Sequence, residues 1–426
     1  MKKTVFGCLG AAAVVFALQF TSANAQAALF SACNPCDEVA CDPCDPCGDS
    51  NACNPCDAVC GTKAGKWFLN GHMEAGFFAN GHGNKSTYTG NYWYTGRGAD
   101  YDSGNSNLLQ NTRLTGAQIN QVYISMGKSV DGRRGLDIGG TVDFTWGSDA
   151  YFAQARGMEF GAGHGLAPDE GRWGTGDYYA AFAQAYVEAE WGRWNVKAGK
   201  FYAPFGIDSY KSTDNFFYSW SPTAYMAPHT AGGAYVTYTV NSQLAVLGGW
   251  AMPDEFGESS KNNVFLGGFI WTPSKRFSLS YTFATGENTY DPSNTGYHNE
   301  DLFVNSLGAT VQINKRLKYV FDWTLLNVNG KAPRTDRYAV YSIMNELIYQ
   351  YNKKWAFGAR FGVLNDNDWE TDWYTISLGA NWTPNKWLTV KPELRYDWMG
   401  DGNTALFNNS ENTYQFSGGM SAVVKF

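Results

Sequence analysis

The chain has 426 residues and a formal net charge of −7; 16% of its residues are aromatic and 48 are glycine. Its apolar runs are short, alternating and rich in Tyr, Trp and Phe, unlike the long helical patterns of a soluble enzyme of this size. The modest charge and the scarcity of Lys/Arg clusters weigh against a nucleic-acid partner. Composition therefore predicts an all-β protein, and a barrel can use such a length as one unit.

The first 25 residues have the organisation of a secretory signal peptide. Lys2 and Lys3 give a positive start, residues 5–20 are apolar, and residues 23–25 read Ala-Asn-Ala, a typical cleavage site. An uncleaved membrane anchor is the weaker alternative, because the apolar run is shorter than the roughly 20 residues that cross a bilayer. We expect an exported protein whose mature chain begins at Gln26.

Residues 26–66 form a Cys-rich, acidic segment that we expect to be a short disordered tether in the periplasm. Its eight cysteines are Cys33, Cys36, Cys41, Cys44, Cys47, Cys53, Cys56 and Cys60. Their C-x-x-C spacings suit a soft metal, but an even number of thiols in an oxidising compartment favours disulfides. Lipid attachment at Cys33, or no specific role, also stays open. We expect no cofactor.

From Trp67 onward, runs of about ten residues with period-2 alternation follow one another, as membrane strands require. Sixteen such runs cover residues 67–80, 116–128, 135–146, 180–191, 193–202, 232–240, 243–252, 263–272, 276–285, 302–313, 316–327, 337–351, 354–364, 372–382, 387–398 and 413–426. Short polar turns alternate with mostly longer connections, which is typical of outer-membrane barrels. We therefore predict a closed antiparallel transmembrane β-barrel of about 16 strands over residues 67–426.

The stretch "LTVKPELRYDW", residues 388–398, is the clearest of these runs, because its apolar residues alternate with four charged ones. Such a charged face predicts a lumen wall. The candidate lumen-wall residues along the chain are Asp143, Glu188, Glu190, Lys197, Arg360, Lys391, Glu393, Arg395 and Asp397. They carry both signs, so they predict no strong ionic preference.

The chain ends in an amphipathic run, "YQFSGGMSAVVKF", whose last residue is Phe426. A terminal aromatic that closes such a strand resembles the signal by which outer-membrane assembly machinery recognises its clients. The alternative is an ordinary last strand that happens to end in Phe.

Four blocks, "LDIGGTVDFTWGSDA", "AYVEAEWGRWNVKAGKFYAPFG", "TDNFFYS" and "LTVKPELRYDW", resemble in order and spacing the β-barrel porin family described as OmpL-like. The resemblance covers nearly all of residues 67–426. It implies an outer-membrane porin in a diderm bacterium that admits small hydrophilic solutes and ions by passive diffusion. Outer-membrane lipid and lipopolysaccharide are the expected surroundings, and a homotrimer is a candidate assembly.

The third long connection, about residues 203–231, is the candidate constriction. In sixteen-stranded porins this loop commonly folds into the lumen, and by position Asp208, Lys211 and Asp214 become candidate constriction charges. The alternative is an outward cap that never meets the solute.

Catalytic motifs do not emerge from the sequence: the five histidines show no metal-binding spacing, and no G-x-S-x-G is present. We expect no enzyme activity. The alternative function is a structural or adhesive barrel protein, crosslinked or metal-binding through its N-terminal cysteines.

Overall fold

The structure is a computed structural model that describes residues 66–81, 116–159, 173–175, 178–226, 228–253, 263–288, 300–330, 337–367, 371–400, 407 and 412–426. The predicted signal peptide and all eight cysteines of the tether lie outside these residues. Within them, no helix is long and apolar enough to cross a membrane.

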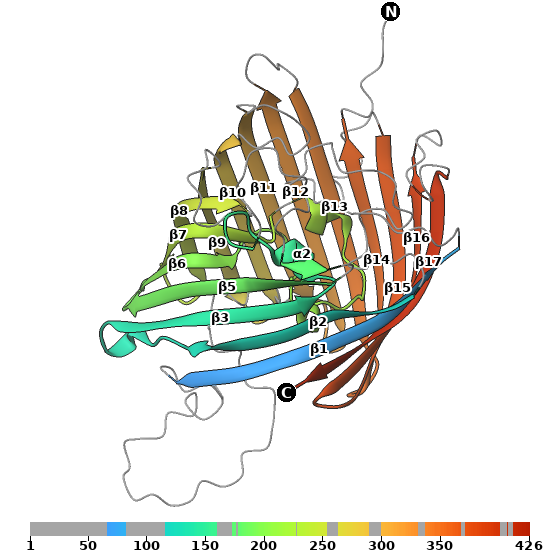
Figure 1. The fold of residues 1–426 in the computed structure, drawn as a ribbon, viewed down its shortest axis with the longest axis horizontal. Coiled ribbons are helices and arrows are strands. Elements are labelled where there is room, and N and C mark those ends of the chain that lie inside the picture. The colour runs from blue at the N-terminus through green and yellow to red at the C-terminus, as the bar shows by residue number, and fades with distance from the viewer. Residues whose placement is uncertain are drawn as a thin grey trace, which may run out of the picture.

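The described strands form a closed antiparallel barrel of sixteen strands (Figure 1), which confirms the predicted fold. The barrel strands are β1 (Trp67–Asn80), β2 (Gly116–Lys128), β3 (Asp137–Gly147), β5 (Tyr178–Trp191), β6 (Trp194–Tyr202), β7 (Thr230–Thr239), β8 (Leu244–Pro253), β9 (Val264–Ser274), β10 (Phe277–Asn288), β11 (Glu300–Gln312), β12 (Leu317–Gly330), β13 (Arg337–Gln350), β14 (Trp355–Asp366), β15 (Thr371–Asn385), β16 (Leu388–Met399) and β17 (Tyr414–Lys425). Each predicted run overlaps one of these strands.

The ring closes where β1 pairs with β17, in an antiparallel register that runs from His72 opposite Lys425 to Asn80 opposite Ser417. Beyond that ladder, the Gly71 N–H donates to the Phe426 carbonyl at 3.0 Å and the Phe426 N–H donates to the Gly71 carbonyl at 2.9 Å. Closure matters in a bilayer because an open edge would leave unpaired backbone groups in hydrocarbon.

Side-chain alternation gives the wall two different faces. On β16, Lys391, Glu393, Arg395 and Asp397 are buried on the inside, while alternate residues such as Leu394 are exposed on the outside. The outer face carries exposed tryptophans near the short turns: Trp191, Trp194, Trp271, Trp355, Trp382 and Trp387. An apolar outer band edged by aromatic residues is what a barrel needs in order to sit in a membrane.

The connections contain short elements that the alternation pattern did not predict. These are β4 (Gly174–Thr175), which pairs only with β5, the helix α2 (Ala150–Ala153), and the 3-10 helices η4 (Gly132–Arg134), η5 (Ser212–Asp214) and η6 (Pro222–Tyr225). Except for η4, they belong to the two connections that follow β3 and β6, and these connections form most of the candidate site.

Candidate functional site

Loop 3, residues 203–229, joins β6 to β7 and crosses the barrel interior. Near its start, the Pro204 carbonyl accepts a hydrogen bond from Thr282 Oγ1 of β10 at 2.5 Å. The Gly206 N–H donates to Ser306 Oγ of β11 at 2.9 Å, and the Ile207 N–H donates to Asp322 Oδ2 of β12 at 3.0 Å. The loop therefore leaves β6 and attaches to strands on a distant part of the ring.

Residues 217–223, the second segment of loop 3, are buried without interruption and centre on Ser219. Arg360 donates to the Ser219 carbonyl at 2.7 Å and to Glu393 Oε1 at 3.2 Å. Glu393 in turn accepts the Ser219 N–H at 2.8 Å and the Ser219 hydroxyl at 2.6 Å. Arg395 donates to the Trp220 carbonyl at 2.9 Å.

We call Ser219, Arg360, Glu393, Arg395 and Asp397 the anchor cluster. Arg395 also donates through Nε to both carboxylate oxygens of Asp397 at 3.0 Å. The Arg360 side chain is only 1% exposed. Buried charges are tolerated where partners and hydrogen bonds satisfy them: here each guanidinium has a wall carboxylate as its ion-pair partner and Ser219 of the loop as a further acceptor. The four predicted lumen-wall residues of the cluster, Arg360, Glu393, Arg395 and Asp397, therefore lie on the inner face but beneath loop 3.

Small residues on the inner wall make room for the loop. A Cβ atom added to Gly358 of β14 would lie 2.3 Å from the Phe216 ring, so any side chain there would displace the loop. The Phe217 ring, the next residue of the loop, lies over the Arg360 guanidinium, 4.5 Å from ring centroid to Cζ. Close approach and a cation–π contact thus add to the hydrogen bonds.

Past the closure of the ring, loop 3 also attaches to β2 and β3. The Tyr218 hydroxyl donates to Asn120 Oδ1 at 3.0 Å, and the Tyr210 hydroxyl donates to Thr145 Oγ1 at 3.3 Å. Gln121 donates to the Tyr210 carbonyl at 2.8 Å. Lys391 of β16 donates to the Asn215 carbonyl at 2.7 Å. Loop 3 is therefore held from several directions and spans the interior.

The connection after β3 also folds inward and is held by a buried ion pair. Lys200 Nζ donates to Glu159 Oε1 and Oε2 at 2.7 and 2.9 Å, and to the Ala153 carbonyl at 2.7 Å. Both side chains are fully buried. Glu159 also accepts the backbone N–H groups of Ala155 at 2.7 Å and Phe182 at 2.9 Å. These bonds of Lys200 and Glu159 join the connection to itself, to β5 and to β6. The ion pair therefore fixes the connection against the wall.

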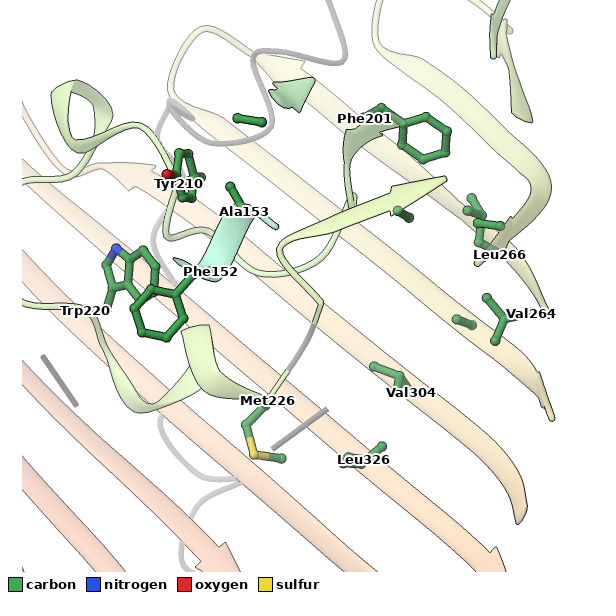
Figure 2. Close-up of a cluster of buried hydrophobic side chains, with 14 of the residues drawn as sticks. Phe152, Ala153, Phe201, Tyr210, Trp220, Met226, Val264, Leu266, Val304 and Leu326 are labelled. Atoms are coloured by element: carbon green, nitrogen blue, oxygen red, sulfur yellow. The ribbon is translucent and has the colours of Figure 1, made fainter. Parts of the chain in front are cut away.

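The two connections meet in an apolar seam formed by Phe152, Trp220, Met226 and His229. The Phe152 and Trp220 ring centroids are 5.0 Å apart, and those of Trp220 and His229 are 4.5 Å apart. Figure 2 shows Met226 between the rings of Phe152 and Trp220 and the wall residues Val304 and Leu326, and these five residues belong to one buried cluster. Burial lowers the pKa of the His229 ring to about 4, because desolvation disfavours its charged form.

The three candidate constriction charges lie in residues 205–216, the first segment of loop 3, and all three are half-buried. Asp208 accepts the Ser221 N–H at 2.8 Å, and Asp214 accepts the Thr213 hydroxyl at 3.0 Å. Lys211 Nζ lies 3.5 Å from Asp143 Oδ2, and its side chain is 27% exposed. The structure brings the three onto one segment but gives each a different partner.

The remaining predicted lumen-wall residues lie on β3, β5 and β6. Asp143 is fully buried and accepts hydrogen bonds from the Tyr123 and Ser125 hydroxyls. Glu188 Oε1 lies 4.0 Å from Lys197 Nζ. Glu190 is half-buried on β5. The analysis of the sequence did not nominate Ser219, Glu159 or Lys200. For Lys200 the sequence offered one signal, a glycine inside the strand, which suggests a bulge; in the structure Gly199 has a φ of 134°, and both Lys197 and Lys200 are buried although strict alternation would put them on opposite faces.

Comparison with known proteins identifies a family for this arrangement. The profile of the family described as "Putative beta-barrel porin-2, OmpL-like" matches residues 70–426. No curated protein matches the chain.

Several solved structures share the fold at low sequence identity. The anion-selective porin from Comamonas acidovorans has 10% identity and a TM-score of 0.56, covering 85% of this chain and 99% of that chain. The outer-membrane channel DcaP of Acinetobacter baumannii has 10% identity and a TM-score of 0.56, with 85% and 98% covered. The trimer form of OmpT from Vibrio cholerae has 11% identity and a TM-score of 0.52, with 85% and 100% covered.

Proposed function

The chain belongs to the OmpL-like beta-barrel porin-2 family, and we propose that this outer-membrane porin passes small hydrophilic solutes and ions by diffusion past the first segment of loop 3. The barrel then works as a channel rather than as an enzyme. In this proposal Asp208, Lys211 and Asp214 are the constriction charges.

The observation that carries the proposal is the contrast within loop 3. Its second segment is buried against β14 and β16 through the anchor cluster, whereas the charged side chains of its first segment stay half-buried. A loop held from several directions gives a constriction of stable width, and the half-buried charges of both signs on its first segment admit ions of either sign. Asp143, Glu188, Glu190 and Lys197 belong to the proposed lumen wall, and of these the half-buried Glu188 and Glu190 are the side chains that a solute would meet.

The same proposal covers the N-terminal region. Residues 1–25 are removed on export, and residues 26–66 remain as a tether in the periplasm, next to the short turns. The start of the barrel supports this side, since the Lys66 carbonyl accepts a hydrogen bond from the Ser129 N–H in the short connection after β2. Disulfides are the favoured state of the tether's cysteines because the periplasm is oxidising. Mass spectrometry of the outer-membrane protein with and without reductant tests both points.

The proposed partners follow from the surface of the barrel. Lipid and lipopolysaccharide surround the exposed aromatic band, and Phe426, which is exposed beside β1, is the contact for the assembly machinery. A homotrimer is the proposed assembly, and a trimer form is described for the OmpT structure from Vibrio cholerae. Native mass spectrometry from detergent distinguishes trimer from monomer.

Planar-bilayer recording tests the proposed function. The purified protein, with and without residues 26–62, is expected to give discrete conductance steps of similar size if, as proposed, the tether is periplasmic. Reversing one constriction charge, Lys211→Glu, is expected to move the reversal potential in a salt gradient toward cation preference. A folded protein that gives no conductance steps would contradict the proposal.

A further inference from the structure

The closure seam is the ladder in which β1, the first strand of the barrel, pairs with β17, the last. Three glycines lie in this ladder: Gly76 of β1, and Gly418 and Gly419 of β17. Glycine weakens the interior of a strand, because it has no side chain to pack and loses more conformational freedom on folding than any other residue. A contact that supports the seam from inside the barrel would therefore stabilise a weak part of the ring.

Loop 3 crosses the inner face of the seam, and Ser212 joins the two strands that flank it. The Ser212 N–H donates to Gln121 Oε1 of β2 at 3.2 Å, and the Ser212 carbonyl accepts a hydrogen bond from Lys391 Nζ of β16 at 2.5 Å. All three residues are buried. In the ring, β17 and β1 lie between β16 and β2. The backbone of one loop residue therefore connects the two sides of the seam.

Three consecutive residues of the second segment alternate between the two sides in the same way. Phe217 lies against Gly379 of β15, where an added Cβ atom would be 3.0 Å from its ring. Tyr218 lies on the other side, since a Cβ atom added to Gly76 of β1 would be 2.3 Å from its hydroxyl oxygen. Ser219 returns to β16 through the bonds of the anchor cluster.

Tyr218 holds the loop to β1 and β2. Its ring packs with Phe78 of β1 in a buried pair, with the two ring centroids 5.7 Å apart. Its hydroxyl donates to Asn120 Oδ1 of β2 at 3.0 Å. Gly76 admits the tyrosine because it has no Cβ atom. The loop thus supplies, at this glycine, side-chain packing that the strand itself lacks.

We propose that loop 3 is an internal clamp of the closure seam. It holds β16 through Ser212 and Ser219, and it holds β1 and β2 through Tyr218 and Ser212, so separating β1 from β17 also requires breaking these contacts. This role goes beyond the constriction and does not depend on conduction. Loop 3 precedes β7 in the chain, so the clamp is already synthesised when β17 pairs with β1.

Hydrogen exchange, followed by mass spectrometry on the full-length barrel refolded in detergent, tests the clamp. The measured quantity is the exchange rate of backbone amides in residues 72–80 and 417–425, divided by that of the β10–β11 ladder elsewhere in the ring. Tyr218→Ala is expected to raise this ratio at least about tenfold, because truncating a buried aromatic favours local opening of the strands it packs on. Trp220→Ala truncates a buried aromatic of the same loop that packs on Phe152, so this matched control is expected to keep the wild-type ratio.

An unchanged ratio in Tyr218→Ala overturns the clamp, and so does an equal rise in Trp220→Ala, since the seam would then respond to any lost packing in the loop. If Tyr218→Ala fails to fold, Tyr218→Phe decides, because it keeps the ring and loses only the bond to Asn120. A rise of about twofold or more confined to the seam then supports the clamp, and no rise overturns it.

Conductance recorded from the same samples separates the clamp from the channel. A seam that depends on Tyr218 in a barrel that does not conduct supports the clamp and contradicts the porin function. A conducting barrel whose exchange ratio is the same in Tyr218→Ala and wild type overturns the clamp and leaves the porin function standing.

Discussion

The two segments of loop 3 each contain one polar side chain that is central to the proposed constriction, Ser219 in the second and Lys211 in the first, and these two side chains differ in how many bonds hold them. In the second segment, Ser219 alone takes part in hydrogen bonds with Arg360, Glu393 and Arg395. In the first segment, Lys211 has one ion pair and two ring faces. The redundant bonds fix position, while the sparse ones leave a charge available. A constriction needs both a fixed position and an available charge, and adjacent segments of one loop supply them.

The largest effect is expected from breaking the anchor cluster. Arg395→Met leaves Asp397 buried without its guanidinium partner, and losing one member of a buried ion pair costs about 3–5 kcal/mol. Loop 3 should then leave the wall, so single-channel conductance should rise and become noisy. Recording beside Lys353→Met, a lysine change on an exposed turn, controls for the lost charge. An unchanged conductance would mean that the second segment does not depend on this cluster.

The apolar seam tests whether the connection after β3 helps to hold the second segment. Trp220→Ala removes the ring that packs on Phe152, and truncating a buried aromatic costs about 3 kcal/mol. The midpoint of urea unfolding, followed on refolded protein in detergent, should fall. Trp220→Phe is the matched control and should recover most of the loss, because it keeps an aromatic surface in the seam.

Acid should weaken the same seam through His229. Its folded pKa of about 4 lies below the ordinary value of 6.5, so the unfolded chain binds the proton more readily. The contribution of the neutral His229 ring to the free energy of unfolding is present above pH 6.5 and is lost as pH falls toward 4. Its size is on the order of 2 kcal/mol after allowing for solvent screening. Urea midpoints at pH 7 and pH 4.5 should differ less in His229→Phe than in wild type. Equal pH dependence would exclude His229.

The smallest stability effect is expected in the first segment. Lys211→Gln removes a partly exposed charge whose partner, Asp143, keeps three other donors, so the unfolding free energy should change by less than about 1 kcal/mol. The anion-to-cation permeability ratio should nevertheless fall, as measured from reversal potentials in a KCl gradient. A large loss of stability with no change in permeability would reverse the roles assigned to the two segments.

The barrel was predictable from the sequence because lipid on one face and a different environment on the other impose a period of two. In β16, Lys391, Glu393, Arg395 and Asp397 could be assigned to the inner face from alternation alone. Alternation cannot say what covers that face. The prediction treated these residues as lumen wall, and the structure adds that loop 3 lies over them, a contact between residues about 140 to 180 positions apart.

The interior partners were less predictable because they depend on tertiary contacts. Ser219 is one serine in an aromatic stretch, and no spacing distinguishes it from Ser221. Glu159 pairs with Lys200 across 41 positions, and local sequence contains no mark of such a pair. Asp208, Lys211 and Asp214 were nominated by loop position, and their roles at the constriction remain predictions for conductance measurements.

The paired backbone bonds between Gly71 and Phe426 have a consequence for biosynthesis. The ladder that seals the ring joins β1 to β17, the first and last strands of the barrel, so the cylinder stays open until β17 has been made. Until that moment both flanking strands present bare edges, which must be shielded on the way to the bilayer. Closure of this barrel therefore follows the synthesis of all its strands.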